Sequence, residues 1–173
     1  YDQIGGGFAR YSTDTEWLAP HFEKMLYDNA LLISVLSEAY QFTKNEKYKR
    51  VIEETVVFLE RELMHADGGF YAALDADSEG EEGKYYVWKY EEVLRLLGPD
   101  AEPFCSYYDI TPRGNWHEGN HTAEIKNIPR ILFPLKEKAA EFSITETELS
   151  ELLAGCKSKL LAEREKRIRP SLD

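Results

Sequence analysis

The chain has 173 residues, 43% of them hydrophobic, so it is long enough to enclose a sizeable core. Its formal net charge of −11 at pH 7 argues against nucleic acid as a partner, because binding to phosphates depends on Lys and Arg. No apolar run approaches the roughly 20 residues that span a bilayer, and no signal-like segment opens the chain, so no membrane partner is expected.

Cysteine usage indicates a reducing compartment. Cys105 and Cys156 lie far apart, and neither belongs to a CxxC motif. We therefore expect a cytoplasmic protein with structural thiols, and no motif predicts a cofactor. Residues 1–173 are expected to form a single domain that is a piece of a longer protein, because Tyr1 already stands inside motif-like sequence.

Two amphipathic helices are predicted in the first third of the chain. Pro20 suits the first turn of a helix, and apolar residues recur after it at spacings of three and four. This first stripe comprises Phe22, Met25, Leu26, Leu32, Ile33, Leu36 and Tyr40. A second stripe comprises Tyr48, Val51, Ile52, Thr55, Val56, Leu59 and Leu63. The short link between them predicts an antiparallel helical hairpin.

A weak internal repeat follows the two helices. Gly68-Gly69-Phe70 echoes Gly6-Gly7-Phe8 about 62 residues earlier, and both copies run on to a Trp, namely Trp17 and Trp88. Because the period equals two helices and a Gly-rich loop, the repeating unit is predicted to be one helical hairpin of a larger array.

The second half of the chain predicts a β-hairpin and two further helices. Residues 69–74 and 84–88 read as two strands on either side of an acidic turn. A short helix is expected over 91–97, followed by a mostly irregular stretch over 99–130. A last helix is predicted from Ser143 or Thr145, each with a Glu three residues on as in a capping box, to about Arg167. The fold class is therefore mainly α.

Several motifs resemble one protein family. The chain carries Gly5-Gly6-Gly7-Phe8, Arg10-Tyr11-Ser12, Pro20 to Ala30 (PHFEKMLYDNA), Asp75-Ala76-Asp77-Ser78, Tyr86-Val87-Trp88 and Arg167 to Asp173 (RIRPSLD). Together they are similar to the signature of the YyaL family, also called the spermatogenesis-associated thioredoxin-domain proteins. The resemblance implies a thioredoxin-like domain ahead of an (α/α)6 toroid similar to N-acylglucosamine 2-epimerases and six-hairpin glycosidases. This chain would be the first part of that toroid, with the thioredoxin-like domain as a partner.

His21 is the leading candidate for acid/base chemistry in the opening stretch. In an α/α toroid the loops that enter the inner helices line a central funnel, and an imidazole there could transfer a proton near neutral pH. Asp14, Glu23 or Asp28 could orient it or act as a second acid/base group. Helical spacing places Asp28 on the face of His21 and Glu23 elsewhere. The alternative is that these carboxylates cap the helix and pair with Arg10 and Lys24.

Asn29 falls on the apolar stripe between Leu26 and Ile33. An unpaired amide at such a position costs about 1 to 3 kcal/mol. It therefore needs a partner, either the backbone or a substrate.

The acidic segment after the second Gly-rich turn offers a second group of candidates. Asp75 and Asp77 could form an acid/base pair or accept hydrogen bonds from sugar hydroxyls, with Trp17 or Trp88 stacking on the ring. Turn chemistry, in which Asp side chains cap their own backbone, is the alternative. The same segment imitates the start of an EF-hand loop, but the twelfth position holds Tyr86 in place of Glu, so calcium is not expected.

A second metal motif is also rejected. Residues 117–121, HEGNH, match HExxH by letter. A zinc site of this kind needs a helix, and Gly119-Asn120 is poor helical sequence. No metal is predicted.

The resemblance thus implies that the chain is part of a carbohydrate-active α/α toroid, which would act on a sugar or sugar derivative as an epimerase, isomerase or hydrolase. The catalytic candidates are His21, Asp14, Asp28, Asp75 and Asp77. The substrate-binding candidates are Arg10, Tyr11, Trp17, Glu23, Tyr27, Asn29 and Trp88. The alternative is a non-catalytic helical scaffold that binds a protein partner or packs against the thioredoxin-like domain.

Overall fold

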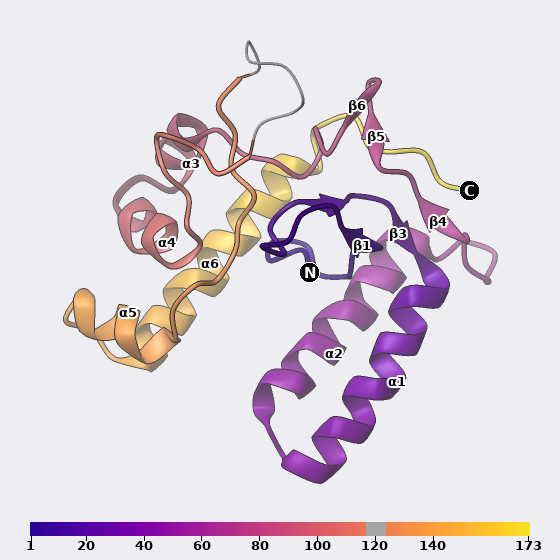
Figure 1. The fold of residues 1–173 in the computed structure, drawn as a ribbon, viewed down its shortest axis with the longest axis horizontal. Coiled ribbons are helices and arrows are strands. Elements are labelled where there is room, and N and C mark those ends of the chain that lie inside the picture. Colours follow the sequence, from indigo (N-terminus) through magenta and orange to yellow (C-terminus); the bar gives the residue numbers. More distant parts are fainter. Residues whose placement is uncertain (117–123) are drawn as a thin grey trace. The chain divides into compact units, whose positions relative to one another are not determined.

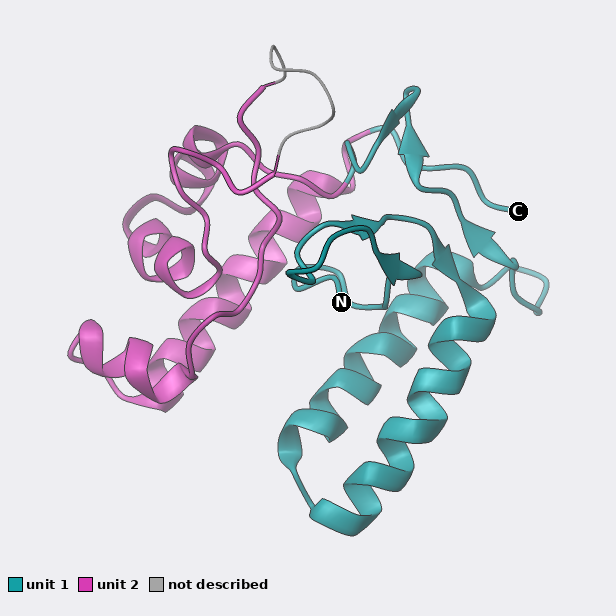
Figure 2. Ribbon diagram, viewed as in Figure 1, with its two compact units in different colours: residues 1–85, 168–173 teal, residues 86–167 magenta. Residues whose placement is uncertain are grey.

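The computed structural model describes residues 1–116 and 124–173 (Figure 1). It is mainly helical with short antiparallel strand pairs, which confirms the predicted fold class at that level. The chain divides into two compact units, residues 1–85 with 168–173 and residues 86–167 (Figure 2).

The first unit contains the predicted helical hairpin. Helices α1 (Leu26–Thr43) and α2 (Glu46–Phe58) lie side by side and are joined by Lys44 and Asn45 (Figure 1). The Asn45 side chain accepts a hydrogen bond from the backbone N–H of Lys47 and so caps α2. The chain then continues from α2 into a π-helical turn, η1 (Leu59–Leu63).

The start of the first helix differs from the prediction. Pro20 lies in strand β2 (Pro20–His21), which pairs with β1 (Tyr11–Ser12), and β3 (Lys24–Met25) leads directly into α1. β3 is extended because it pairs with β4 (Ala73–Leu74), about 50 residues downstream. Helical spacing in the local sequence carries no information about such a distant partner.

The predicted β-hairpin between residues 69–74 and 84–88 is wrong. β4 pairs with β3, and the acidic segment forms its own hairpin from β5 (Asp77–Ser78) and β6 (Glu81–Glu82). Glu79 and Gly80 at its tip have φ of 56° and 76°, the positive values that a two-residue turn between twisted strands requires.

The last residues of the chain return to the first unit. The backbone of Asp173 accepts a hydrogen bond from Ala72 and donates one to Ala73, while Ser171 accepts one from Asp75. Residues 171–173 therefore extend the β3 and β4 pair.

The second unit is built from helices around an apolar core. Its elements are α3 (Tyr90–Leu97), the 3-10 turn η2 (Gly98–Asp100), α4 (Ala101–Tyr107), α5 (Leu135–Glu141) and α6 (Glu146–Arg164). α3 confirms the helix predicted over 91–97. α6 begins with the capping box at Thr145, one of the two predicted starts. Trp88, Val93, Phe104, Leu149 and Leu160 are fully buried among these elements.

α4 lies in the stretch 99–130, for which the sequence predicts a mostly irregular chain with at most short helical turns. Pro103 suggests an interruption of helical structure in the sequence. In the structure it lies in the first turn of α4, where the backbone N–H has no partner within the helix, so its absence costs nothing. α4 packs on α6, so its buried residues Phe104 and Cys105 belong to the core of the unit.

Candidate functional site

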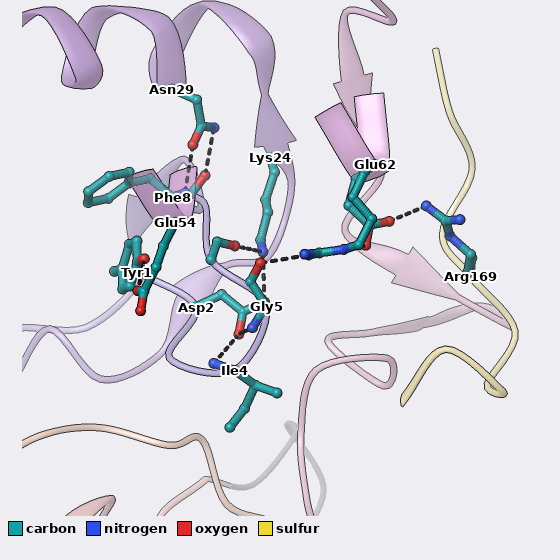
Figure 3. Close-up of polar contacts among 12 residues, drawn as sticks. Tyr1, Asp2, Ile4, Gly5, Phe8, Lys24, Asn29, Glu54, Glu62 and Arg169 are labelled. Atoms are coloured by element: carbon teal, nitrogen blue, oxygen red, sulfur yellow. Dashed lines mark hydrogen bonds and ion pairs between the residues drawn. The ribbon is translucent and has the colours of Figure 1, made fainter. Parts of the chain in front are cut away.

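The Gly-rich opening is a loop held by buried polar side chains (Figure 3). The Asp2 carboxylate accepts hydrogen bonds from the backbone N–H of Ile4 at 3.0 Å and of Gly5 at 3.1 Å. The Lys24 ammonium donates to Asp2 at 2.8 Å and to the Gly6 carbonyl at 2.9 Å. Lys24 is 2% exposed, so its buried positive charge is neutralised by the Asp2 carboxylate.

Asn29 completes this loop from the first turn of α1. Its Oδ1 accepts from the backbone N–H of Phe8 at 2.8 Å, and its Nδ2 donates to the carbonyls of Phe8 at 3.1 Å and Met25 at 2.8 Å. Asn29 is fully buried and both amide hydrogens are used. Of the two partners that the sequence left open, the structure therefore gives the backbone, and Asn29 has no donor left for a substrate.

A second buried carboxylate ties the same loop to η1 and to the end of the chain. Glu62 is 5% exposed and pairs with the guanidinium groups of Arg61 and Arg169 (Figure 3). Arg61 also donates to the carbonyl of Gly5 at 2.6 Å. Lys24 of the opening stretch therefore holds the loop together with charged side chains from elsewhere in the chain, namely Asp2, Arg61 and Glu62.

His21 lies outside this loop network and between two carboxylates. Its Nδ1 is 2.8 Å from Oε1 of Glu82, and its Nε2 is 3.7 Å from Oε2 of Glu23. Glu82 is in β6 and also accepts a hydrogen bond from the backbone N–H of Phe22 at 3.2 Å, so its carboxylate is fixed in position. A carboxylate on Nδ1 favours the tautomer that keeps the proton there, which leaves Nε2 to accept or release one.

Arg10, Tyr11 and Tyr27 surround this histidine. Arg10 donates to Glu23 and to the hydroxyl of Tyr27, both at 3.1 Å. The hydrogen bond to Glu23 raises the pKa of the Arg10 guanidinium above its ordinary value. The Tyr11 ring stacks on the His21 ring with centroids 5.0 Å apart. We call these residues the His21 cluster: Arg10, Tyr11, His21, Glu23, Tyr27 and Glu82.

The cluster corrects one prediction and adds one residue. Because residues 20–25 are extended and not helical, Glu23 approaches His21, and the helical face that His21 and Asp28 were predicted to share does not form. Glu82 was missed. It lies 61 residues from His21, and only the β5 and β6 hairpin brings it there.

The remaining acidic candidates have other surroundings. The Asp14 carboxylate accepts hydrogen bonds from the backbone N–H groups of Glu16, Leu18 and Ala19, which lower its pKa. Asp75 accepts from the N–H of Asp77 at 3.3 Å, the turn chemistry that stood as the alternative. Asp14 and Asp75 therefore shape their own loops.

Asp28 and Asp77 keep free acceptor capacity. Oδ2 of Asp28 is buried, with no hydrogen-bond partner among the residues that the structure describes. Asp77 is the cross-strand partner of Glu82 in the β5 and β6 hairpin, and cross-strand partners point to the same face. Asp77 thus lies next to the cluster without a described contact to His21.

The two tryptophans differ in what they offer to a ligand. Trp17 is 85% exposed in the loop that Asp14 shapes, so its ring is accessible from solvent. Trp88 is in the second unit, fully buried, with the Arg167 guanidinium 4.0 Å from its ring centroid. Trp88 therefore exposes no ring to a ligand in this structure, and its role in substrate binding stays a prediction.

Residues 1–116 and 124–173 contain no group of three or more His, Cys, Asp and Glu side chains that could hold a metal ion, and His117 and His121 lie outside these ranges. No helix within them is long and apolar enough to cross a membrane.

A cavity of about 280 Å³ lies in the second unit. Its lining includes Tyr90, Cys105, Asp109, Ile110, Phe133 and Lys138, and none of the site residues predicted from the sequence. It is therefore distinct from the His21 cluster, which belongs to the first unit.

Both cysteines are expected to be unreactive in the folded chain. Burial raises the pKa of Cys105 to about 12 and that of Cys156 to about 11, and the thiolate is the species that attacks reagents. At pH 8 we expect labelling by an aromatic disulfide reagent to be slow in buffer and complete within minutes in denaturant. Rapid labelling of the native protein, followed by absorbance, would contradict the buried positions of both thiols.

Comparison with known proteins places these features in a wider context. No protein-family model matches the chain. Over 99% of its length it is 37% identical to spermatogenesis-associated protein 20 of Homo sapiens and 36% identical to the protein of that name in Mus musculus. It is also 34% identical, over its full length, to an uncharacterised protein of Caenorhabditis elegans. The chain spans about a quarter of the length of these relatives (24 to 26%).

Proposed function

We propose that these residues are one part of a longer protein similar to spermatogenesis-associated protein 20, and that they form the first part of an α/α toroid. Its His21 cluster would transfer protons on a sugar or sugar derivative. The observation that carries the proposal is the placement of His21, with one carboxylate 2.8 Å from Nδ1 and another 3.7 Å from Nε2.

The contacts of His21 support an acid/base role. Glu82 would hold the proton on Nδ1 and stabilise the imidazolium that forms when Nε2 accepts a proton from the substrate. Glu23 would then be the second titratable group, on the side of Nε2. Side chains of His21 and Glu23 are 27% and 23% exposed, so both are accessible without being fully solvated.

The groups around the histidine fit a polyhydroxylated ligand. Arg10 and the hydroxyl groups of Tyr11 and Tyr27 supply donors and acceptors of the kind that sugar hydroxyls use. The exposed ring of Trp17 would stack on the apolar face of a sugar. Asp77, beside Glu82, adds a carboxylate acceptor.

The product of the full reading frame should be screened for binding and turnover of mono- and disaccharides. We expect His21→Ala to lower turnover by about 100-fold or more, the usual contribution of a positioned acid/base group. Glu82→Gln should lower it less and shift its pH profile, because the amide still fills the space but no longer stabilises the imidazolium. His65→Ala is the matched control, since His65 lies on the surface of the same unit outside the cluster.

A second function is favoured by a different observation. Lys24, Asn29 and Arg61 use their polar groups on the loop itself, so much of the motif is explained by structure alone. In a non-catalytic scaffold that works with a thioredoxin-like domain, these polar groups would serve only to hold the loop in its conformation. Failure of the wild-type protein to bind or convert any sugar would favour the scaffold, whereas turnover by His21→Ala equal to that of the wild type would remove His21 from the acid/base role.

A further inference from the structure

The cavity in the second unit is lined by apolar side chains that meet water. Leu132 and Phe133 lie just before α5, and they are 51% and 49% exposed. Ile110, which follows α4 and belongs to the same lining, is 2% exposed. The volume of about 280 Å³ is close to the lower end of the range of roughly 300 to 1,000 Å³ that ligand pockets occupy. The cavity therefore has room for a ligand smaller than a typical drug.

The cations near this lining already have carboxylate partners. The Lys138 ammonium donates to Oε2 of Glu141 at 2.8 Å and to Oγ of Ser106 at 2.9 Å. The hydrogen bond from Lys138 lowers the pKa of the Glu141 carboxyl, so the pair carries both charges at neutral pH. The Arg130 guanidinium donates to Oδ2 of Asp109 at 2.7 Å. An anionic ligand would have to compete with these two carboxylates for its donors.

The carboxylates in the lining have acceptor capacity to spare. Glu102, in α4, is exposed and makes no hydrogen bond or ion pair with any other residue that the structure describes. Asp109 uses one of its two carboxylate oxygens on Arg130. With Lys138 the only cation in the lining, two carboxylates face one ammonium there, and the whole chain carries a net charge of −11. The electrostatic potential at the cavity therefore favours a cation.

We propose that this cavity binds a small primary amine with an apolar body. The ammonium group of the ligand pairs with Glu102, and the nearby charge of Asp109 reinforces this pair. The hydrocarbon part covers the exposed surface of Leu132 and Phe133, so its removal from water supplies most of the free energy of binding. The site is separate from the His21 cluster, which belongs to the first unit, and does not depend on sugar chemistry.

Charge distinguishes an amine from other small apolar ligands. A carboxylic acid of the same size would face Glu102 and Asp109 as like charges, and such juxtaposition is unfavourable. A neutral alcohol would gain the same apolar contacts without an ion pair. The aromatic rings of Tyr90 and Phe133 in the lining also attract cations through their faces. The Lys138 ammonium, 5.0 Å from the centroid of the Phe133 ring, is an example within the structure.

Calorimetric titration of the intact protein with phenethylamine tests this inference, with phenethyl alcohol and hydrocinnamate as neutral and anionic probes of similar size. At neutral pH we expect saturable binding of the amine, about fivefold tighter than that of either other probe, which is what one exposed ion pair can supply. Glu102→Gln should remove the preference for the amine over the alcohol, because the amide keeps the shape and loses the charge. Glu137→Gln is the matched control, since Glu137 is exposed on α5 and does not line the cavity.

Phe133→Ala gives an independent measurement of the apolar contact. Because Phe133 is half exposed, the variant should fold, and it should bind the amine and the alcohol more weakly by the same factor. Equal affinity for all three probes, or no saturable binding of the amine up to about 10 mM, would overturn the inference. Tighter binding of hydrocinnamate would also overturn it and assign the cavity to an anion held by Lys138. An equal loss of preference in Glu137→Gln would place the bound amine elsewhere.

Discussion

Replacing Asn29 with Ala is expected to lower the free energy of unfolding of the first unit by about 3 to 5 kcal/mol. The substitution removes the partners of the Phe8 N–H and of the carbonyls of Phe8 and Met25, and the site is fully buried. Urea denaturation followed by circular dichroism measures the loss. Small domains are stable by only about 5 to 15 kcal/mol, so partial unfolding of the variant at 37 °C would also agree with this prediction.

Asn45→Ala is the matched control for Asn29→Ala. Asn45 is exposed and accepts one hydrogen bond as the cap of α2, from the backbone N–H of Lys47. Loss of such a cap costs about 1 kcal/mol. Equal effects of the two substitutions would mean that Asn29 does not hold the opening loop as described.

Replacing Gly7 with Ala is expected to destabilise the first unit by about 3 kcal/mol or more. Gly7 has φ of +79°, and a Cβ there would lie 2.4 Å from Cδ1 of Phe58. Phe58 is 1% exposed, so its ring has little room to move away. The variant should therefore show both backbone strain and overpacking, measured as a lower midpoint in urea.

Gly68→Ala separates these two contributions. Gly68 also has a positive φ, +89°, but no atom lies within 4 Å of a Cβ built there. It should lose only about 1 to 2 kcal/mol, the cost of the left-handed backbone for Ala. If Gly7→Ala were no less stable than Gly68→Ala, a clash between the added Cβ and Phe58 would not contribute to the loss of stability.

The two Gly-rich turns also show how far the internal repeat extends. Gly6, Gly7, Gly68 and Gly69 all have positive φ values, so the two Gly-Gly-Phe segments are similar in backbone conformation as well as in sequence. Their surroundings differ, because the first pair packs on α2 and the second is open.

The opening stretch combines two kinds of residue that the sequence alone did not separate. Lys24 and Asn29 are buried and hold the loop, whereas His21 and Glu23 are partly exposed and meet side chains from other elements. Alternating side-chain direction in the extended residues 21–24 explains the separation: Phe22 and Lys24 point inward, and His21 and Glu23 outward.

The sequence by itself determined the mainly helical fold, the α1 and α2 hairpin, α3, and the capping box of α6. These features depend on spacing and capping within a few residues of one another, so a local pattern is sufficient. It also singled out five of the six residues of the His21 cluster.

Only the tertiary structure decided where α1 begins, how the strands pair, and that Glu82 is the partner of His21. Each of these depends on contacts between residues about 50 to 60 positions apart, such as β3 with β4 and His21 with Glu82. Two-residue strands are too short to show a period, and their pairing is stabilised by backbone hydrogen bonds that carry no side-chain signature. The burial of Trp88 and the exposure of Trp17 also depend on which distant elements pack around each ring, so the sequence could not distinguish them.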